Sequence, residues 1–219
     1  MKRKVNTHHE LNLIYKKLFA FFGPQGWWPG RTRLEIILGA ILTQNTNWVN
    51  VERALMNLKK AGFMNLSKLN KISPSQLAVL IKPSGYYNIK AQRLKNFIDF
   101  IFSEYGGRLD RMAKQPLEVL RHKILAVNGI GLETADSILL YAFDKPVFVV
   151  DAYTKRILSR HHMIPKDADY HSVQEIFMNN LNADVQFFNE YHALLVRCAK
   201  EYCRVKPLCQ QCPLMGRAR

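Results

Sequence analysis

Apolar side chains recur at helical spacing through most of this sequence. The clearest stripe follows the i, i+3, i+4, i+7, i+8 pattern that one face of an α-helix presents to a core, and it consists of Leu34, Ile37, Leu38, Ile41 and Leu42. Similar stripes predict helices over residues 51–58, 74–81, 91–101, 117–125, 153–160, 171–181 and 186–200, with another beginning at 132. The strand-like run Val147–Val150 is too short to found a sheet, so the pattern predicts an all-α fold.

Local signals indicate where helices begin and which faces are polar. Ser73 followed by Pro74 is typical of an N-cap with proline at the first helical position. Lys90, Arg93 and Lys95 fall on or beside the polar side of the helix predicted over 91–101. We therefore expect these three cations at the surface, where Lys90 is a candidate phosphate contact.

The charge balance indicates a polyanionic partner. The 219 residues carry 32 Lys and Arg against 17 Asp and Glu, a formal net charge of +15, while a hydrophobic share of 48% excludes a disordered chain. Nucleic acid is the first candidate partner and an anionic membrane surface the second. No apolar run is long enough to span a membrane, and no apolar stretch of a secretion signal follows the basic residues 1–4. We therefore expect an intracellular, cytoplasmic protein.

All four cysteines lie near the C-terminus, at Cys198, Cys203, Cys209 and Cys212. Their spacing, C-x4-C-x5-C-x2-C, ends in a tight pair that lets two thiolates reach one metal. Thiolates suit zinc and iron–sulfur clusters. The alternative is that they are reduced thiols on a tail, since an intracellular protein rarely carries structural disulfides.

Two glycines, Gly129 and Gly131, separate two predicted helices. They permit a tight turn, and the helix beginning at Leu132 points its free amides and positive dipole end the same way. Such a hairpin binds a DNA phosphate without reading sequence. An ordinary turn between helices would explain the same two glycines.

Asp151 directly follows the apolar run at 147–150. An acid in this position is held rigidly near apolar surroundings, so its pKa is raised or it has a partner. It also precedes a predicted helix, which makes it a candidate N-cap. Both roles are compatible, because a cap position fixes the carboxylate in place.

Five segments together resemble the endonuclease III superfamily of DNA glycosylases, whose signature is a helix-hairpin-helix followed by a Gly/Pro/Asp motif. They are residues 42–46, 85–91, 127–136, 149–156 and 206–213. The segments follow one another in the family's order, and the resemblance covers roughly residues 30–213. It implies two helical domains. One is a six-helix barrel-like domain over 33–145 that ends in the hairpin, and the other combines 1–32 with 146–219 and holds a cysteine metal loop.

The resemblance also implies an activity, namely base excision repair. The family flips a damaged base out of double-stranded DNA and cuts its glycosidic bond. Asp151 matches the aspartate that stabilises the cationic sugar. Bifunctional members carry a lysine where this chain has Glu133, and a carboxylate forms no imine. We therefore expect a monofunctional enzyme without lyase activity. A monomer associated with the nucleoid is the accompanying expectation.

Other matched positions are candidate DNA contacts. Gln44 is the candidate wedge that fills the gap left by the flipped base, with Asn45 beside it in the same segment. The alternative for Gln44 is a polar residue that closes its own helix. Lys155 joins Lys90 as a candidate phosphate contact, although either could be solvated surface charge.

The sequence also contains aromatic residues suited to stacking on a base. Trp27, Trp28 and Pro29 form one candidate group and Trp48 lies close to Gln44 in sequence. Indole faces attract cationic N-alkylated purines. These segments resemble the 3-methyladenine glycosylase branch of the family, which makes an alkylated purine the expected substrate. Alternative substrates are a mismatched thymine or uracil and an oxidised pyrimidine. An alternative function is a non-catalytic module that binds damaged DNA. The alternative for the tryptophans is a role in the core.

The cysteine spacing departs from the pattern C-x6-C-x2-C-x5-C of the resembled family. No cysteine follows Cys212, so Cys198 is the remaining candidate for a fourth thiolate. The alternative is that Cys198 is buried in the last helix, which leaves three thiolates and makes His192 a competing ligand. A structural [4Fe–4S] cluster is the first expectation, zinc the second and no metal the third.

Overall fold

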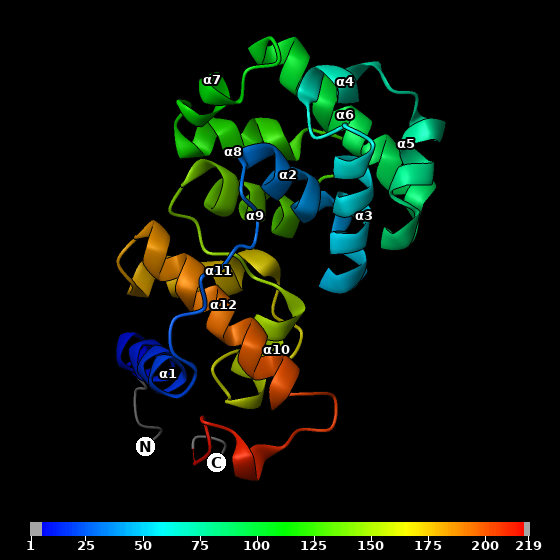
Figure 1. The fold of residues 1–219 in the computed structure, drawn as a ribbon. Coiled ribbons are helices and arrows are strands. Elements are labelled where there is room, and N and C mark those ends of the chain that lie inside the picture. Colours follow the sequence, from blue (N-terminus) through cyan, green and yellow to red (C-terminus); the bar gives the residue numbers. More distant parts are fainter. Residues whose placement is uncertain (1–5, 217–219) are drawn as a thin grey trace. The chain divides into compact units, whose positions relative to one another are not determined.

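The computed structural model describes residues 6–216, and over this range the chain forms twelve α-helices and two short 3-10 turns without a strand (Figure 1). The all-α prediction is confirmed. The basic run at residues 1–4 lies outside the described range. No helix within 6–216 is both long and apolar enough to cross a membrane.

The chain divides into two compact units. The first comprises Pro29–Lys145, and the second joins the described residues up to Trp28 with those from Pro146 onward. The sequence-based division places its first boundary between residues 32 and 33 rather than between 28 and 29.

The unit at 29–145 is built around helices that bury the predicted apolar stripes. Its α2 packs against α9, α5 against α6, and α8 against α9. Ile37, Leu38 and Ile41 are at most 1% exposed, as the stripe predicts. The elements are α2 (Arg33–Leu42), α3 (Trp48–Lys60), α4 (Leu66–Lys71), α5 (Pro74–Leu80), η1 (Lys82–Ser84), α6 (Tyr87–Tyr105), α7 (Leu109–Ala113), α8 (Leu117–Leu125) and α9 (Leu132–Phe143).

Over its described residues, the other unit contains four α-helices and a buried apolar segment that packs against α11 and α12. Its elements are α1 (Thr7–Phe22), α10 (Ala152–Arg160), α11 (Tyr170–Asn180), α12 (Val185–Glu201) and η2 (Cys209–Gln211). The segment at 147–150 is buried but forms no strand. Phe148 stacks on Phe177 of α11 with ring centroids 3.7 Å apart, and its carbonyl accepts a hydrogen bond from Gln174 Nε2 at 2.7 Å. This packing fixes the backbone immediately before Asp151.

Helix boundaries follow the predicted capping signals where such signals exist. Ser73 caps α5 in a full capping box with Gln76, and Pro74 is the first helical residue. The sequence analysis did not predict α1, although Leu11, Ile14 and Leu18 give this helix an apolar stripe that is fully buried.

Candidate functional site

Side chains of the same unit donate hydrogen bonds to the backbone carbonyls of the hairpin between α8 and α9. Asn96 of α6 donates from Nδ2 to the carbonyl of Asn128 at 3.1 Å. Gln44 donates from Nε2 to the carbonyl of Gly129 at 3.1 Å and to the Thr134 hydroxyl at 3.0 Å. The turn is therefore anchored through its carbonyls before any ligand arrives.

The two hairpin glycines serve different purposes. Gly129 has φ of +90°, and a Cβ there would collide with Cγ of Arg93, so both backbone conformation and space require glycine. Gly131 has φ of −91° and meets nothing within 4 Å of an added Cβ. Its missing side chain instead leaves open room in front of the first amides of α9, where an anion is favoured.

Gln44 is tied into this hairpin. Its Oε1 accepts a 2.5 Å hydrogen bond from Arg93 Nη1, while its Nε2 donates to the hairpin as described above. Asn45, the next residue, is exposed and has φ of +54°, a left-handed conformation that asparagine tolerates well. The segment after α2 thus carries two adjacent side-chain amides: that of Gln44 is fixed by hydrogen bonds, and that of Asn45 is exposed.

Asp151 is the N-cap of α10 and is 9% exposed. Its Oδ1 accepts a 2.7 Å hydrogen bond from the Thr154 amide, which confirms the cap expected from sequence. Burial raises the pKa of the Asp151 carboxyl, but the hydrogen bond and charge of His192 and the hydrogen bonds from Thr154 outweigh burial and hold that pKa below its usual value. The carboxylate is therefore a fixed anion in a nearly water-free place, which is the form that stabilises developing positive charge.

Residues 38–183 match the family described as HhH-GPD superfamily base excision DNA repair protein. The matched range contains both the hairpin and Asp151. This chain belongs to the HhH-GPD superfamily.

Individual relatives of this HhH-GPD protein agree with that assignment. A Methanocaldococcus jannaschii protein that bears the provisional name of a DNA repair glycosylase is 48% identical over 213 residues, covering 96% of each chain. Endonuclease III of Thermotoga maritima is 27% identical over 81% of this chain and 78% of its own length. The crystal structure of H. pylori 3-methyladenine DNA glycosylase bound to 1,N6-ethenoadenine matches with a TM-score of 0.76 and 30% identity, covering 90% of this chain and 98% of that one.

The HhH-GPD chain carries its candidate stacking residues in both units. Trp27 and Trp28 are half-buried, are joined by a cis peptide bond, and meet edge to face with ring centroids 5.6 Å apart. Pro29 is exposed at the start of the other unit, and half-buried Trp48 begins α3, where its Nε1 donates to Glu52 at 2.8 Å. All four retain exposed surface that a base could contact.

The expectation that Lys90 lies at the surface is wrong. Its side chain is 1% exposed, and its ammonium donates to the carbonyls of Leu42 at 2.8 Å and Ser84 at 2.6 Å. Burial, followed by the charge of Arg93, lowers the pKa of Lys90 to about 8. The ammonium satisfies two carbonyls at helix ends, so it faces the interior rather than a phosphate.

Lys95 departs from the prediction in the same way. It is 9% exposed and donates to the carbonyls of Leu69 and Asn70, at the end of α4. Lys155 is half-buried on α10 and donates to the carbonyl of Ala168 at 2.9 Å.

We expect Lys90→Met to lower the free energy of unfolding by about 1–3 kcal/mol, because the two carbonyls lose their buried donor. The salt dependence of DNA binding should stay unchanged, whereas loss of a phosphate contact reduces its slope by about 1. Urea unfolding and binding titrations at several salt concentrations measure both. Lys155→Met is the comparison variant, and a reduced slope for Lys90→Met would restore its role as a phosphate contact.

The four cysteines do not converge in this structure. Cys198 and Cys212 have their Sγ atoms 4.0 Å apart, but Cys203 accepts a hydrogen bond from Arg160 at 3.2 Å and Cys209 is exposed. The Cys198 contact outweighs burial and lowers the pKa of Cys212 to about 6, while the same contact and burial raise the pKa of Cys198. Within residues 6–216, no three or more His, Cys, Asp or Glu side chains are arranged to hold a metal ion.

The predicted four-cysteine metal site is therefore not formed in this arrangement. Arg160 also donates to the carbonyls of Arg204 and Val205, at 2.6 and 3.0 Å. These bonds tie the start of the loop after α12 to α10, and Cys209 farther along that loop is exposed.

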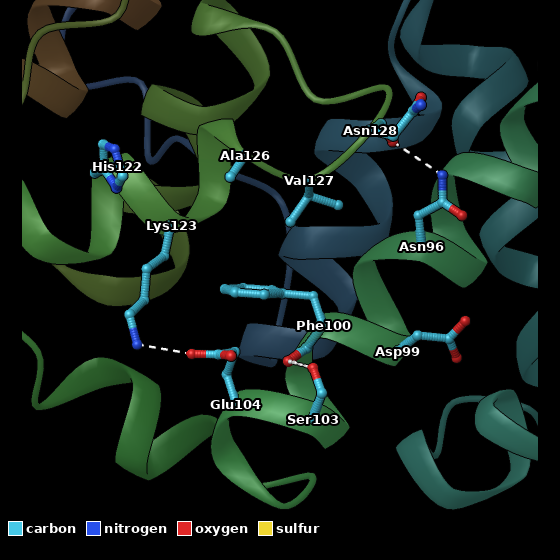
Figure 2. A pocket seen from close by; sticks show the side chains of 10 residues that line it. All are labelled: Asn96, Asp99, Phe100, Ser103, Glu104, His122, Lys123, Ala126, Val127 and Asn128. Carbon is cyan, nitrogen blue, oxygen red and sulfur yellow. Dashed lines mark hydrogen bonds and ion pairs between the residues drawn. The ribbon is translucent and has the colours of Figure 1, made fainter.

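A pocket lies on the unit at 29–145 between α6 and α8, beside the hairpin (Figure 2). Phe100 and Val127 provide its apolar surface, and the ion pair of Lys123 with Glu104, at 2.7 Å, borders it. None of the predicted base-contacting residues lines it. The pocket therefore borders the start of the hairpin segment, at Val127 and Asn128, and does not include Asp151 or the candidate stacking residues.

Proposed function

We propose that this protein is a monofunctional DNA glycosylase that releases a damaged base by hydrolysis. The observation that carries this proposal is the buried, ionised carboxylate of Asp151, fixed at the start of α10 in a chain of the HhH-GPD superfamily. Double-stranded DNA containing a damaged base is the partner, a single chain is the active form, and the nucleoid inside the cell is the place of action. The net charge of +15 fits a polyanionic partner.

In the proposed reaction the C1′–N bond breaks and its electron pair leaves with the base. Positive charge develops on the sugar, and the Asp151 carboxylate stabilises that charge. The oxygen of a water molecule then bonds to C1′ and its proton passes to solvent, which leaves an abasic site in an uncut strand. A cationic N-alkylated purine leaves as a neutral base, so this step requires no general acid.

Glu133 supports the absence of lyase activity. Strand cleavage through an imine requires an amine nucleophile, and the family position for that lysine holds a carboxylate in the first turn of α9. Several relatives bear the name endonuclease III, but they are about 27% identical or less. The chemistry at position 133 is the more direct guide for this chain.

An alkylated purine, such as 3-methyladenine, is the proposed base. Partly exposed indoles at Trp27, Trp28 and Trp48, together with the rigid Pro29, suit stacking on a flipped cationic ring. The 30% identical H. pylori neighbour is a 3-methyladenine glycosylase. A thermostable thymine-DNA glycosylase is similar at 22% identity and a TM-score of 0.74, which shows the fold alone.

DNA contacts are proposed at the hairpin and the segment after α2. The open space at Gly131 and the free amides of α9 receive a phosphate, with Gly129 forming the turn. Gln44 fills the gap left by the flipped base and Asn45 contacts the opposite strand. Lys155 adds a phosphate contact.

We also propose a structural metal at the cysteines, with a [4Fe–4S] cluster first and zinc second. Cys198 and Cys212 already lie together, and inward movement of the loop would add Cys203 and Cys209. Iron, sulfide and zinc analysis of protein purified without oxygen tests this proposal. Purified protein that lacks all three when folded and active would refute it.

The experiment on function uses duplex oligonucleotides, each with one labelled lesion. The panel contains an alkylated purine, uracil, a mismatched thymine and an oxidised pyrimidine, and products are resolved with and without dilute alkali. We expect cleavage of the alkylated substrate only after alkali, with no protein–DNA adduct after borohydride reduction.

Three results would change the proposal in different ways. A strand cut without alkali, or a borohydride adduct, would refute monofunctional chemistry. Release of uracil or thymine instead of the alkylated purine would correct the base and keep the mechanism. Tight binding of every duplex with no release would favour a DNA-damage-binding module.

A further inference from the structure

The two oxygens of Asp151 are held by different helices. Oδ1 accepts from the Thr154 amide of α10 at 2.7 Å, and Oδ2 lies 3.5 Å from Nε2 of His192 on α12. The two side chains are only 10% and 6% exposed. Within this unit α10 and α12 pack directly together. The orientation of the carboxylate therefore depends on a residue far away in sequence.

His192 occupies an otherwise apolar stretch of α12. The residues from Tyr191 to Val196 are all buried, and Phe148 meets the imidazole edge to face with ring centroids 6.5 Å apart. A polar ring in such a place is costly unless it is paired. Helix packing alone would be satisfied by an apolar side chain of similar size, so the imidazole points to a role in the contact with Asp151.

We infer that His192 is a positioning residue for base release, because it holds Oδ2 of Asp151 from α12 while α10 holds Oδ1. The inference rests on the proposed function of Asp151. His192 does not touch the base or sugar in this account. It acts through the carboxylate, much as a partner group orients a catalytic side chain in other hydrolases.

The contact also sets the pH range in which Asp151 is ionised. Burial raises the pKa of Asp151, and the groups that oppose burial are His192 from α12 and Thr154 from α10. Without His192, burial is opposed by Thr154 alone and the pKa of Asp151 rises. Since only the ionised carboxylate stabilises the sugar cation, the acid limb of the rate profile must move to higher pH.

The test is the pH profile of single-turnover base release, measured with saturating enzyme on the lesion duplex that the wild type processes. His192→Phe keeps a flat ring against Phe148 but removes the polar contact. We expect its acid limb to rise by roughly 1–3 pH units, because Asp151 loses the partner from α12 that opposes burial. His192→Gln keeps a donor that can reach Oδ2, so its limb should rise less. DNA affinity should be unchanged in both.

His171→Phe is the matched control, because His171 is exposed on α11 of the same unit. Its profile should match the wild type. A His192→Phe limb that coincides with the wild-type limb at an unchanged rate would overturn the inference. If that variant fails to fold, His192→Leu decides, because it also removes the polar contact and an unshifted limb there contradicts the role. An active Asp151→Asn enzyme would instead show that the proposed function itself has failed.

Discussion

Replacing Asp151 by asparagine should reduce base release by about 10²–10³-fold or more, because the developing sugar cation loses its fixed counter-charge. Binding to lesion DNA should persist or tighten, since an anion that repels the phosphate backbone is removed. Single-turnover release and equilibrium binding, measured on one lesion duplex, test both expectations.

This variant isolates charge from folding. Asparagine caps helices as well as aspartate does, so the Thr154 amide keeps its acceptor and α10 keeps its start. Asp169→Asn makes the same change at the N-cap of α11 in the same unit, where the carboxylate is exposed and accepts from Ser172. That control should release base at the wild-type rate. Full activity of Asp151→Asn would contradict the mechanism.

The second large effect concerns stability beside the hairpin. Arg121→Ala should lower the free energy of unfolding by about 3–5 kcal/mol. Arg121 of α8 makes a two-point ion pair with Asp136 of α9, at 2.7 and 3.0 Å, and the Asp136 carboxylate has no exposed surface. Removing the arginine leaves a buried carboxylate without its cation, in the two helices that carry the hairpin.

Urea unfolding measures this loss, and two further variants separate its causes. Arg108→Ala removes an exposed ion pair with Asp110 and should leave stability almost unchanged. The double variant Arg121→Met/Asp136→Leu removes both charges and should recover most of the loss. A single Arg121→Ala variant as stable as Arg108→Ala would show that the buried pair contributes little.

Apolar periodicity and capping signals were sufficient to predict much of the fold. The stripe of α2 is buried as expected, and Ser73 and Asp151 cap the helices that follow them. These features are local, because helix period and cap chemistry act over a few residues. The placement of Asp151 as a buried N-cap was predictable for the same reason, since an acid after a buried segment is fixed by its own backbone.

Features that depend on distant partners were not predictable. The sequence predicts Lys90 and Lys95 at the surface. Both are buried, because carbonyls at helix ends elsewhere in the unit accept hydrogen bonds from their ammonium groups. The contact of His192 with Asp151 was not predicted, because only the packing of α10 on α12 brings the two side chains together. The cysteines cluster in sequence, but the structure brings the Sγ atoms of Cys198 and Cys212 within 4.0 Å while Cys209 is exposed.

Mass spectrometry of free bases released from methylated genomic DNA tests the central claim most directly. The wild type should release 3-methyladenine or 7-methylguanine, Asp151→Asn should release neither, and unmethylated DNA should yield nothing with either protein. Release of those bases by Asp151→Asn at the wild-type rate would contradict the assigned chemistry. Absence of release by the wild type would contradict an alkylated purine as the substrate.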